Sequence, residues 1–297
     1  MKKVLLLFRS RIGMQSAAVP FAAKVGRLLG DDVEIKTAEI GEMLFEVSTN
    51  DAKITNPAQN LDVKDFDLVI IRHIGALDAE AHAVAVFCRK HGIKFIDSYL
   101  DRIIDDKMSA AFEHYSVGAP LPRTFYGPLD EMIKCLPELG GKAIFKDNRG
   151  NKGKLNFVVS SADEMRQISN DNPDVHFQLQ EFIPNDCDYR ILVLNYKPVF
   201  AIRRMAESGS HLNNTSQGGA AEIVPLENMN EAILDMAIKV SRVEGLEVSG
   251  VDVVIDNTNG KFYILEVNHA PMISSGSFQD EKAKVYANMI AEILSGE

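Results

Sequence analysis

"YILEVNHAP" (residues 263–271) reads as the end of a buried β-strand, yet it carries an acid and an amide. Side chains alternate along a strand, so one face of this strand is expected to hold Phe262, Ile264, Glu266 and Asn268. That face therefore ends in a polar pair, Glu266 and Asn268, which needs an explanation.

A second strand pattern lies just upstream. "GVDVVI" (250–255) is followed by the turn-rich "DNTNG" (256–260), so the segment predicts a β-hairpin with 262–268. Counting back from the turn places Asp252 opposite Glu266, where two ionised carboxylates repel each other unless positive charge lies between them. Two acids and an amide suit Mg²⁺ or Mn²⁺ better than zinc. A solvated hairpin face is the alternative that these residues alone leave open.

Composition limits the class of protein. The chain has 297 residues, enough for two or three domains, and a formal net charge of −10 without a block of Lys or Arg, which argues against a nucleic-acid partner. Cys88, Cys135 and Cys187 are odd in number and show no C-x-x-C spacing, so neither a disulfide framework nor a zinc site is predicted. The apolar run 4–8 is too short for a signal peptide or a membrane span. We therefore expect a cytoplasmic protein with no membrane partner.

The first hundred residues alternate short apolar runs with helical patterns. This βαβ rhythm predicts an α/β N-terminal domain built on a parallel sheet covered by helices. The predicted strands are 4–8, 33–37, 68–71 and 94–96, with helices near 17–29 and 79–91. The segment 47–61 lacks clear periodicity and is predicted to be loop.

Two α+β units are predicted after the connection "VGAPLPRTFYGP" (117–128). In the first, a helix begins at Ser161, where Glu164 three residues later completes a capping box. In the second, a hairpin turns at Asn195 and Tyr196. The expected strands are 143–146, 157–159, 177–182, 189–194 and 198–203, and the expected later helices are 229–243 and 280–294.

"FKDNRGNKGK" (145–154) ends a strand in Lys146 and opens a loop with Gly150 and Gly153. Glycines let backbone N–H groups approach a phosphate, and lysine adds a point charge. The segment is not a Walker A motif, because the G-K-[ST] ending and the following helix are missing. A flexible basic hairpin tip is the alternative.

Arginines occur inside two predicted strands. "CDYRILVLN" (187–195) places Asp188 and Arg190 on one face, and "FAIRRM" (200–205) delivers Arg203 and Arg204 at a strand end. A guanidinium stays charged at any relevant pH, so burial requires an anionic partner. That partner is either a substrate anion or an internal acid, and Asp188 is the nearest candidate for Arg190.

Taken in order, these motifs resemble the ATP-grasp superfamily, most closely its RimK-like carboxylate–amine ligases of the glutamate ligase type. The ordered set also includes "FQLQEFIP" (177–184) and "HLNNTSQGG" (211–219), and the resemblance spans about residue 100 to the C-terminus. It implies three parts: an N-terminal α/β (pre-ATP-grasp) domain at 1–100, a lid-type α+β subdomain at 101–184, and a C-terminal ATP-grasp subdomain with the metal site at 185–297.

The resemblance also implies roles for single residues. Asp252, Glu266 and Asn268 match ligands of two Mg²⁺ or Mn²⁺ ions, and Arg190 and Arg204 are expected to act catalytically by holding a substrate carboxylate. The residues expected to contact ATP are Lys107, Lys146, Gly150, Gly153, Glu181, Phe182, Ile183, Asp188 and Asn214. The sequence departs from the family where Arg149, Lys152 and Lys154 make the 149–155 loop bulkier and more basic, and where His269 replaces a smaller residue.

These observations predict an ATP-dependent ligase that joins a carboxylate to an amine. The family chemistry implies an acyl-phosphate intermediate, release of ADP and phosphate, and addition of an amino acid to a peptide, protein or metabolite. Relatives commonly form dimers or tetramers, so a homo-oligomer is left open. Two alternatives remain: a small-molecule kinase on the same fold, and a non-catalytic nucleotide-binding regulatory protein. We expect Asp252→Asn to fold and to abolish turnover.

Overall fold

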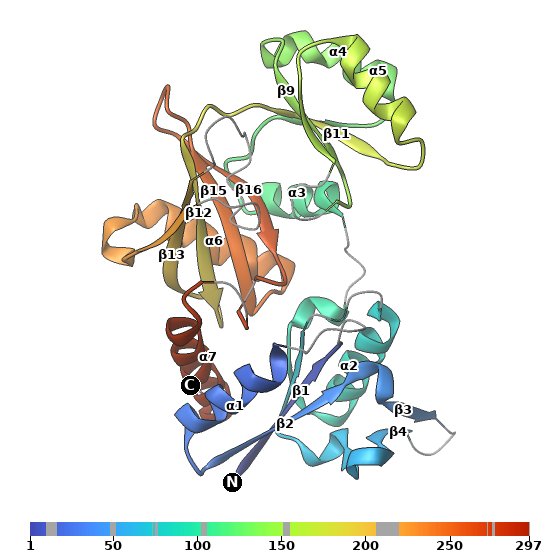
Figure 1. Cartoon of the computed structure of the whole chain (residues 1–297), viewed down its shortest axis with the longest axis vertical. Coiled ribbons are helices and arrows are strands. Elements are labelled where there is room, and N and C mark those ends of the chain that lie inside the picture. Colours follow the sequence, from blue (N-terminus) through green and yellow to red (C-terminus); the bar gives the residue numbers. More distant parts are fainter. Residues whose placement is uncertain are drawn as a thin grey trace.

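The computed structural model describes residues 1–9, 17–47, 52–72, 74, 77–101, 106–150, 155–205, 220–271, 273–274 and 277–296. Two predicted ATP contacts, Gly153 and Asn214, lie outside these residues. Figure 1 shows one unit at the bottom, formed by the N-terminal part of the chain, and two sheet-containing units above it.

The N-terminal unit is the predicted parallel α/β layer. Its sheet has the order β2-β1-β6-β7, and all three pairings are parallel. Leu5 and Leu7 face the cluster that contains α2, whereas Val4 and Leu6 face the cluster that contains α1, as expected for strands buried on both faces. The elements are β1 (Lys2–Phe8), α1 (Ala18–Leu29), β2 (Val33–Glu39), β6 (Leu68–Ile71), α2 (Asp78–His91) and β7 (Lys94–Ile96).

The segment predicted as loop at 47–61 is partly strand, so that prediction is wrong. β3 (Leu44–Val47), β4 (Ala52–Asn56) and β5 (Leu61–Asp62) form a small antiparallel sheet. Strands this short do not repeat a period-2 pattern often enough to be recognised in a sequence.

The second unit is an antiparallel sheet of order β10-β9-β11-β8, with two helices packed on one side. The capping box is confirmed, because the Glu164 N–H donates to Ser161 Oγ at 3.2 Å and the Ser161 N–H donates to the Glu164 carboxylate at 3.2 Å. Its elements are β8 (Thr124–Tyr126), α4 (Leu129–Cys135), β9 (Ala143–Asp147), β10 (Asn156–Val159), α5 (Ala162–Asp171) and β11 (Phe177–Glu181).

The third unit is a larger antiparallel sheet of order β14-β13-β12-β15-β16. The predicted turn at Asn195 and Tyr196 is confirmed, and both residues have positive φ, 48° and 59°. α6 covers one face of this sheet, and α3 lies between the two upper units (Figure 1). The elements are α3 (Lys107–Ser116), β12 (Cys187–Leu194), β13 (Lys197–Met205), β14 (Ala220–Val224), α6 (Glu231–Glu244), β15 (Val248–Ile255) and β16 (Phe262–Asn268).

The last helix, α7 (Gln279–Ser295), packs beside α1 rather than on α6 (Figure 1). Tyr286 of α7, Val4 of β1 and Val248 of β15 belong to one apolar cluster. This helix therefore joins the C-terminal sheet to the N-terminal unit. The domain boundaries at 1–100, 101–184 and 185–297 stay predictions. None of the helices in the described ranges is long and apolar enough to cross a membrane.

The hairpin of β15 and β16 contains a bulge that the sequence did not reveal. Asp252 pairs with Glu266, as predicted, but its neighbour Val253 pairs with Ile264, so Leu265 is an extra residue. Ile264 packs with Val253 in the cluster under α6. The expectation that Ile264 and Glu266 share a face is therefore wrong, because a bulge reverses the alternation along its strand. The bulge lets the strand bury Ile264 on one face and present Glu266 on the other.

Candidate functional site

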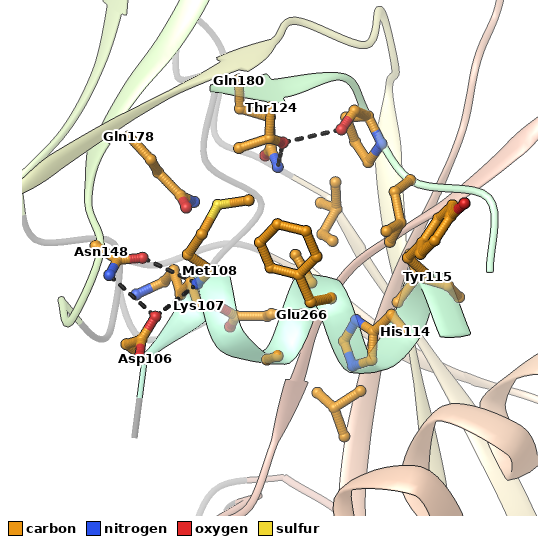
Figure 2. Close-up of a pocket in the computed structure, with 18 of the residues that line it drawn as sticks. Asp106, Lys107, Met108, His114, Tyr115, Thr124, Asn148, Gln178, Gln180 and Glu266 are labelled. Carbon is orange, nitrogen blue, oxygen red and sulfur yellow. Dashed lines mark hydrogen bonds between the residues drawn. The ribbon is translucent and has the colours of Figure 1, made fainter. Parts of the chain in front are cut away.

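A cavity of about 510 Å³ lies between the second and third units. Its walls come from α3, from the loop after β9, from β11 and from β16 (Figure 2). The polar lining includes Lys107, Asn148, Gly150, Gln180 and Glu266. The cavity thus brings together residues from the predicted phosphate-binding and metal-binding segments.

The N-terminus of α3 is fastened to the loop that follows β9. Asp106 caps the helix by accepting the N–H groups of Met108 at 3.0 Å and Ser109 at 2.9 Å. Asn148 accepts the Lys107 N–H with its carbonyl oxygen and the Met108 N–H with its side chain, both at 3.0 Å. The roles of Asp106 and Asn148 were not predicted from the sequence, although Asp before a helix is a capping signal.

Lys107 and Gly150, predicted separately as ATP contacts, lie together in the structure. The Lys107 Nζ donates to the carbonyl oxygens of Asp147, at 3.2 Å, and Gly150. The ammonium group is therefore held at the mouth of the Gly-containing loop, on the wall of the cavity.

Lys146 is almost completely buried at the end of β9, with 8% of its surface exposed. Its Nζ donates to Gln180 Oε1 at 2.9 Å, so its direct partner is a neutral amide. Burial lowers the pKa of Lys146 to about 8; Glu266 opposes this shift and Lys107 adds to it. A desolvated cation beside a second lysine is suited to meeting an anion. The Gln180 contact was not predicted, although Gln178 and Gln180 alternate visibly along β11.

Replacing Lys146 by Met should stabilise the nucleotide-free protein. Because the pKa of Lys146 is lowered in the folded state, the buried ammonium reduces the free energy of unfolding. This destabilisation is complete below pH 8, and it disappears as the pH rises from about 8 toward the ordinary pKa of 10.5. We expect a gain of a few degrees in Tm at pH 7 that shrinks toward pH 10.5, measured by thermal unfolding. Lys261→Met, at an exposed position, is the control. A variant that is less stable than the parent at pH 7 would contradict this account.

Two arginines and two acids form a cluster on the third sheet, in which all but the partly exposed Arg190 are buried. Arg190 binds Asp252 through two hydrogen bonds of 2.7 Å, and Arg204 binds Asp188 through bonds of 2.6 and 2.7 Å. Arg204 also lies 3.1 Å from Asp252. Internal pairing therefore occurs, but the pairing of Asp188 with Arg190 suggested by the sequence is wrong.

Cross-strand register explains the exchange of partners. Asp188 lies directly opposite Arg204 of β13, and Arg190 lies directly opposite Asp252 of β15. Residues directly opposite each other approach within about 5 Å, closer than residues two apart on one strand. Arg190 and Arg204 can therefore satisfy their acids without distortion. The roles of both arginines and of Asp188 toward substrate and ATP stay predictions.

Asp252 is ionised, and it shares one side of the hairpin with Glu266, its cross-strand partner. Burial alone would raise the pKa of Asp252, but Arg190 and Arg204 outweigh burial and hold it at about 2. Asn268 donates its amide N–H to Asp252 at 3.1 Å and to the carbonyl oxygen of Gly250 at 3.3 Å. Within the described residues, the Glu266 carboxylate has no hydrogen bond or ion pair.

The three predicted metal ligands are therefore close together, and they fit a hard divalent cation. Their oxygens are carboxylate and amide oxygens, the ligands that Mg²⁺ and Mn²⁺ prefer. A carboxylate has about four lone-pair sites, so Asp252 can accept from arginines and still offer an oxygen. Among the residues that the structure describes, Glu266, which interacts with Lys146 only at longer range and has no hydrogen bond or ion pair, is the strongest sign that this wall is built to meet a positive charge.

The predicted adenine contacts are not part of the cavity lining. Glu181 accepts the N–H of Arg123 at 3.1 Å, Lys142 Nζ lies 3.9 Å from the centre of the Phe182 ring, and Ile183 is buried. Their role toward a nucleotide stays a prediction. His269 does line the cavity, and its ring lies 5.5 Å from that of Tyr99 in the N-terminal unit.

A further buried pair lies on the α3 side of the cavity. His114, only 3% exposed, contacts Glu244 at the end of α6. Figure 2 shows His114 and Tyr115 at the opposite end of α3 from Asp106 and Lys107. No local sequence signal indicates this pair, because its members lie 130 residues apart.

Comparison with known proteins identifies the family. The model of the RimK-like ATP-grasp domain matches residues 127–293, more than half of the chain. The chain belongs to this family. The resemblance inferred from the ordered motifs is thereby confirmed.

Individual relatives of this RimK-like chain match over about half of it. A probable alpha-L-glutamate ligase of Legionella pneumophila (strain Corby) is 31% identical over 160 residues, which cover 52% of this chain and 51% of the relative. N-acetylaspartylglutamate synthase A of Homo sapiens is 28% identical over 158 residues, covering 51% of this chain and 39% of the relative. The matches thus span about half or less of the relatives' own length.

The fold extends beyond the matched region. The ATP-grasp ligase PsnB, solved with a minimal precursor, Mg and ADP, superposes with a TM-score of 0.74 at 16% identity, covering 98% of this chain and 96% of that chain. At this identity the superposition shows the fold alone. It confirms that the RimK-like chain has the ATP-grasp fold.

Proposed function

We propose that this chain is an ATP-dependent carboxylate–amine ligase that forms an amide bond and releases ADP and phosphate. The observation that carries the proposal is the meeting, at and beside one cavity, of the cations Lys107 and Lys146 with Glu266, which has no hydrogen bond or ion pair within the described residues. A nucleoside triphosphate with its divalent cations would bring phosphates to the two lysines and positive charge to Glu266. The names of the related glutamate ligase and synthase support an amino acid as the source of the amine.

Lys107, Lys146 and the backbone around Gly150 would hold the phosphates. Lys107 is already oriented by the carbonyl oxygens of Asp147 and Gly150, and Lys146 is already desolvated, so little reorganisation is needed when charge develops on the transferring phosphoryl group. Asp252, Glu266 and Asn268 would hold the divalent cations, which supply charge neutralisation of the phosphate oxygens. No described residue needs to act as a nucleophile.

The reaction would proceed in two balanced steps. An oxygen of the substrate carboxylate attacks the γ-phosphorus, the bond from that phosphorus to the β,γ-bridging oxygen breaks, and ADP leaves. The amine nitrogen then attacks the acyl carbon, the bond from that carbon to the phosphate oxygen breaks, and phosphate leaves as the amine loses a proton. Both steps depend on positioning, which aligned binding groups provide.

Arg190 and Arg204 would contribute differently. The Arg190 side chain is 17% exposed and the Arg204 side chain 5%. Arg190 can keep one edge of its guanidinium for a substrate carboxylate while the other edge holds Asp252. Arg204, which contacts both Asp188 and Asp252, would instead fix the two acids. This revises the expectation of equal roles.

Trapping with hydroxylamine tests the proposed reaction. The protein is incubated with Mg·ATP, hydroxylamine and pooled carboxylates, and hydroxamate and ADP are measured. We expect both products, in equal amounts, because hydroxylamine replaces the amine in the second step. AMP with pyrophosphate would show an adenylate route and refute the proposal, and ADP formation independent of any amine would favour the kinase.

A further inference from the structure

Arg72 lies directly after β6 and is only partly satisfied. Its side chain is 7% exposed, and its Nη1 donates to Asp97 Oδ2 at 2.5 Å. Its Nη2 is buried and has no hydrogen-bond partner within the described part of the chain. A buried guanidinium N–H without a partner is costly, so natural proteins rarely keep one without a ligand or a special role.

The position of Arg72 in the sheet is the one where ligands are expected. The Arg72 N–H donates to the Leu7 carbonyl oxygen at 2.9 Å, so Arg72 lies at the carboxyl ends of both β1 and β6. β2 pairs on one side of β1 and β6 on the other, so the strand order changes direction here. Open parallel sheets bind ligands in the crevice at this switch point.

Asp97 connects Arg72 to the reaction site proposed above. Asp97 directly follows β7, is 1% exposed, and accepts the Val248 N–H at 2.7 Å at the start of β15. Asp252 lies four residues further along the same face of β15, a distance of about 13 Å at ~3.3 Å per residue. The Arg190 side chain extends toward the start of β15, because its Cδ lies 3.1 Å from where a β-carbon at Gly250 would be, two residues from Val248. Arg72 and Arg190 therefore both lie near the start of β15.

Charged groups of both signs lie near Arg72. Burial raises the pKa of Asp97 to about 7; Arg72 opposes this shift, and the Glu247 carboxylate, which accepts hydrogen bonds from Ser98 and Tyr196, adds to it. Asp97 therefore does not fully neutralise Arg72 at neutral pH. α7 adds Lys282, which is 6% exposed and whose pKa is lowered by burial and then by Arg190. One turn later, Tyr286 lies within electrostatic range of both Arg72 and Asp97. α7 thus extends from the neighbourhood of Arg190 to that of Arg72. The cationic groups Arg72, Lys282 and Arg190 favour an anionic ligand between them.

We propose that Arg72 binds the carboxylate of the amino acid that supplies the amine, with Lys282 adding positive charge from α7. This inference rests on the proposed ligase function. The activated carboxylate has to lie at the nucleotide, on the Glu266 side, whereas Arg72 approaches from the N-terminal sheet. The acceptor amino acid would enter with its carboxylate on Arg72 and its amine directed toward Arg190 and Asp252.

The first arm of the test uses the unmodified protein. Each of the twenty amino acids and its carboxamide is assayed as acceptor with the carboxylates that give hydroxamate, and as a stabiliser in thermal shift without ATP. We expect at least one amino acid to be used, with kcat/KM about 10²-fold above that of its amide, because an unpaired buried donor is left when the carboxylate is lost, and to raise Tm. Equal use of acid and amide would overturn the role of Arg72.

The second arm uses the double variant Arg72→Met/Asp97→Asn. It removes both charges of the pair, so no buried charge is left alone, and the amide oxygen introduced at position 97 can still accept from the Val248 N–H. Hydroxamate formation should stay within about threefold, because hydroxylamine has no carboxylate, while amino-acid turnover should fall about 10²-fold through KM. The exposed pair Lys2 and Asp67, 2.9 Å apart, supplies the control variant Lys2→Met/Asp67→Asn, which should change neither rate.

The outcomes separate this inference from the proposed function. If the double variant keeps the preference for amino acid over amide, Arg72 is not the binding group and the inference fails. If the unmodified protein forms no hydroxamate, the ligase proposal fails, and the thermal-shift panel then decides the role of Arg72. The role of Arg72 is overturned if no amino acid raises the Tm of the unmodified protein, or if the double variant shows the same rise in Tm. If the double variant does not fold, the comparison of acids with amides on the unmodified protein decides.

Discussion

Replacing Glu266 by Gln should reduce Mg²⁺-dependent formation of ADP by at least about 10³-fold while leaving the fold unchanged. The substitution removes a formal charge at the cavity wall, where hard cations and phosphate oxygens would meet. It does not break an ion pair or hydrogen bond within the described residues, because Glu266 makes none there. Activity and Tm are measured on the same preparation.

This substitution separates a metal role from a structural role. Glu227→Gln, at an exposed position before α6, is the matched control and should change neither the activity nor the Tm. Because Glu266 raises the pKa of Lys146, its loss should also lower that pKa further. Full activity in Glu266→Gln would remove the metal assignment and, with it, the main support for the ligase proposal.

Replacing Asp252 by Asn should abolish activity and also destabilise the protein. The sequence alone suggested that this variant would fold normally, but the structure places Asp252 between Arg190 and Arg204. Removing one partner of a buried ion pair costs about 3 kcal/mol or more, because the remaining charges are left without compensation. We expect a fall in Tm of about 10 °C.

The pH dependence of this effect follows from the lowered pKa. Asp252 has a pKa of about 2 in the folded protein, below its ordinary value of 3.8, so its contribution to stability is complete above about pH 4 and lost as the pH falls toward 2. Burial raises the pKa of Asp188 to about 6 and Asp252 adds to this shift, so the difference in the free energy of unfolding between parent and variant should change with pH below about 7. From about pH 7 to 8 it should be constant within about 0.5 kcal/mol, by denaturant titration. Unchanged stability at pH 7 would show that the two arginines do not depend on Asp252.

The sequence predicted the long helices and strands because periodicity and capping are local signals. The Ser161 capping box, the turn at Asn195 and the pairing of Asp252 with Glu266 all depend on neighbours in the chain or on counting from a turn. The small sheet at 44–62 was missed because its strands are too short to repeat a pattern.

Errors at the site arose where the outcome depends on three-dimensional neighbours. The extra residue Leu265 changes the face of Ile264, and nothing in "YILEVN" indicates it. Proximity in the sequence suggested that Asp188 pairs with Arg190, whereas the cross-strand register places Asp188 opposite Arg204. The pairing of Arg72 with Asp97 was not predicted, because it depends on two strands of one sheet and on the start of β15 in another.

The packing of α7 against α1 has a consequence for how the chain is made. Residues of β1 and α1 are synthesised early, but part of the apolar surface that they bury packs against the last helix, in one cluster with Ala283, Tyr286 and Ile290. A nascent chain on the ribosome therefore exposes that surface until the last helix has left the exit tunnel, and a prematurely terminated chain would expose it permanently. Such truncated products should be captured by chaperones or degraded rather than accumulate as stable N-terminal fragments.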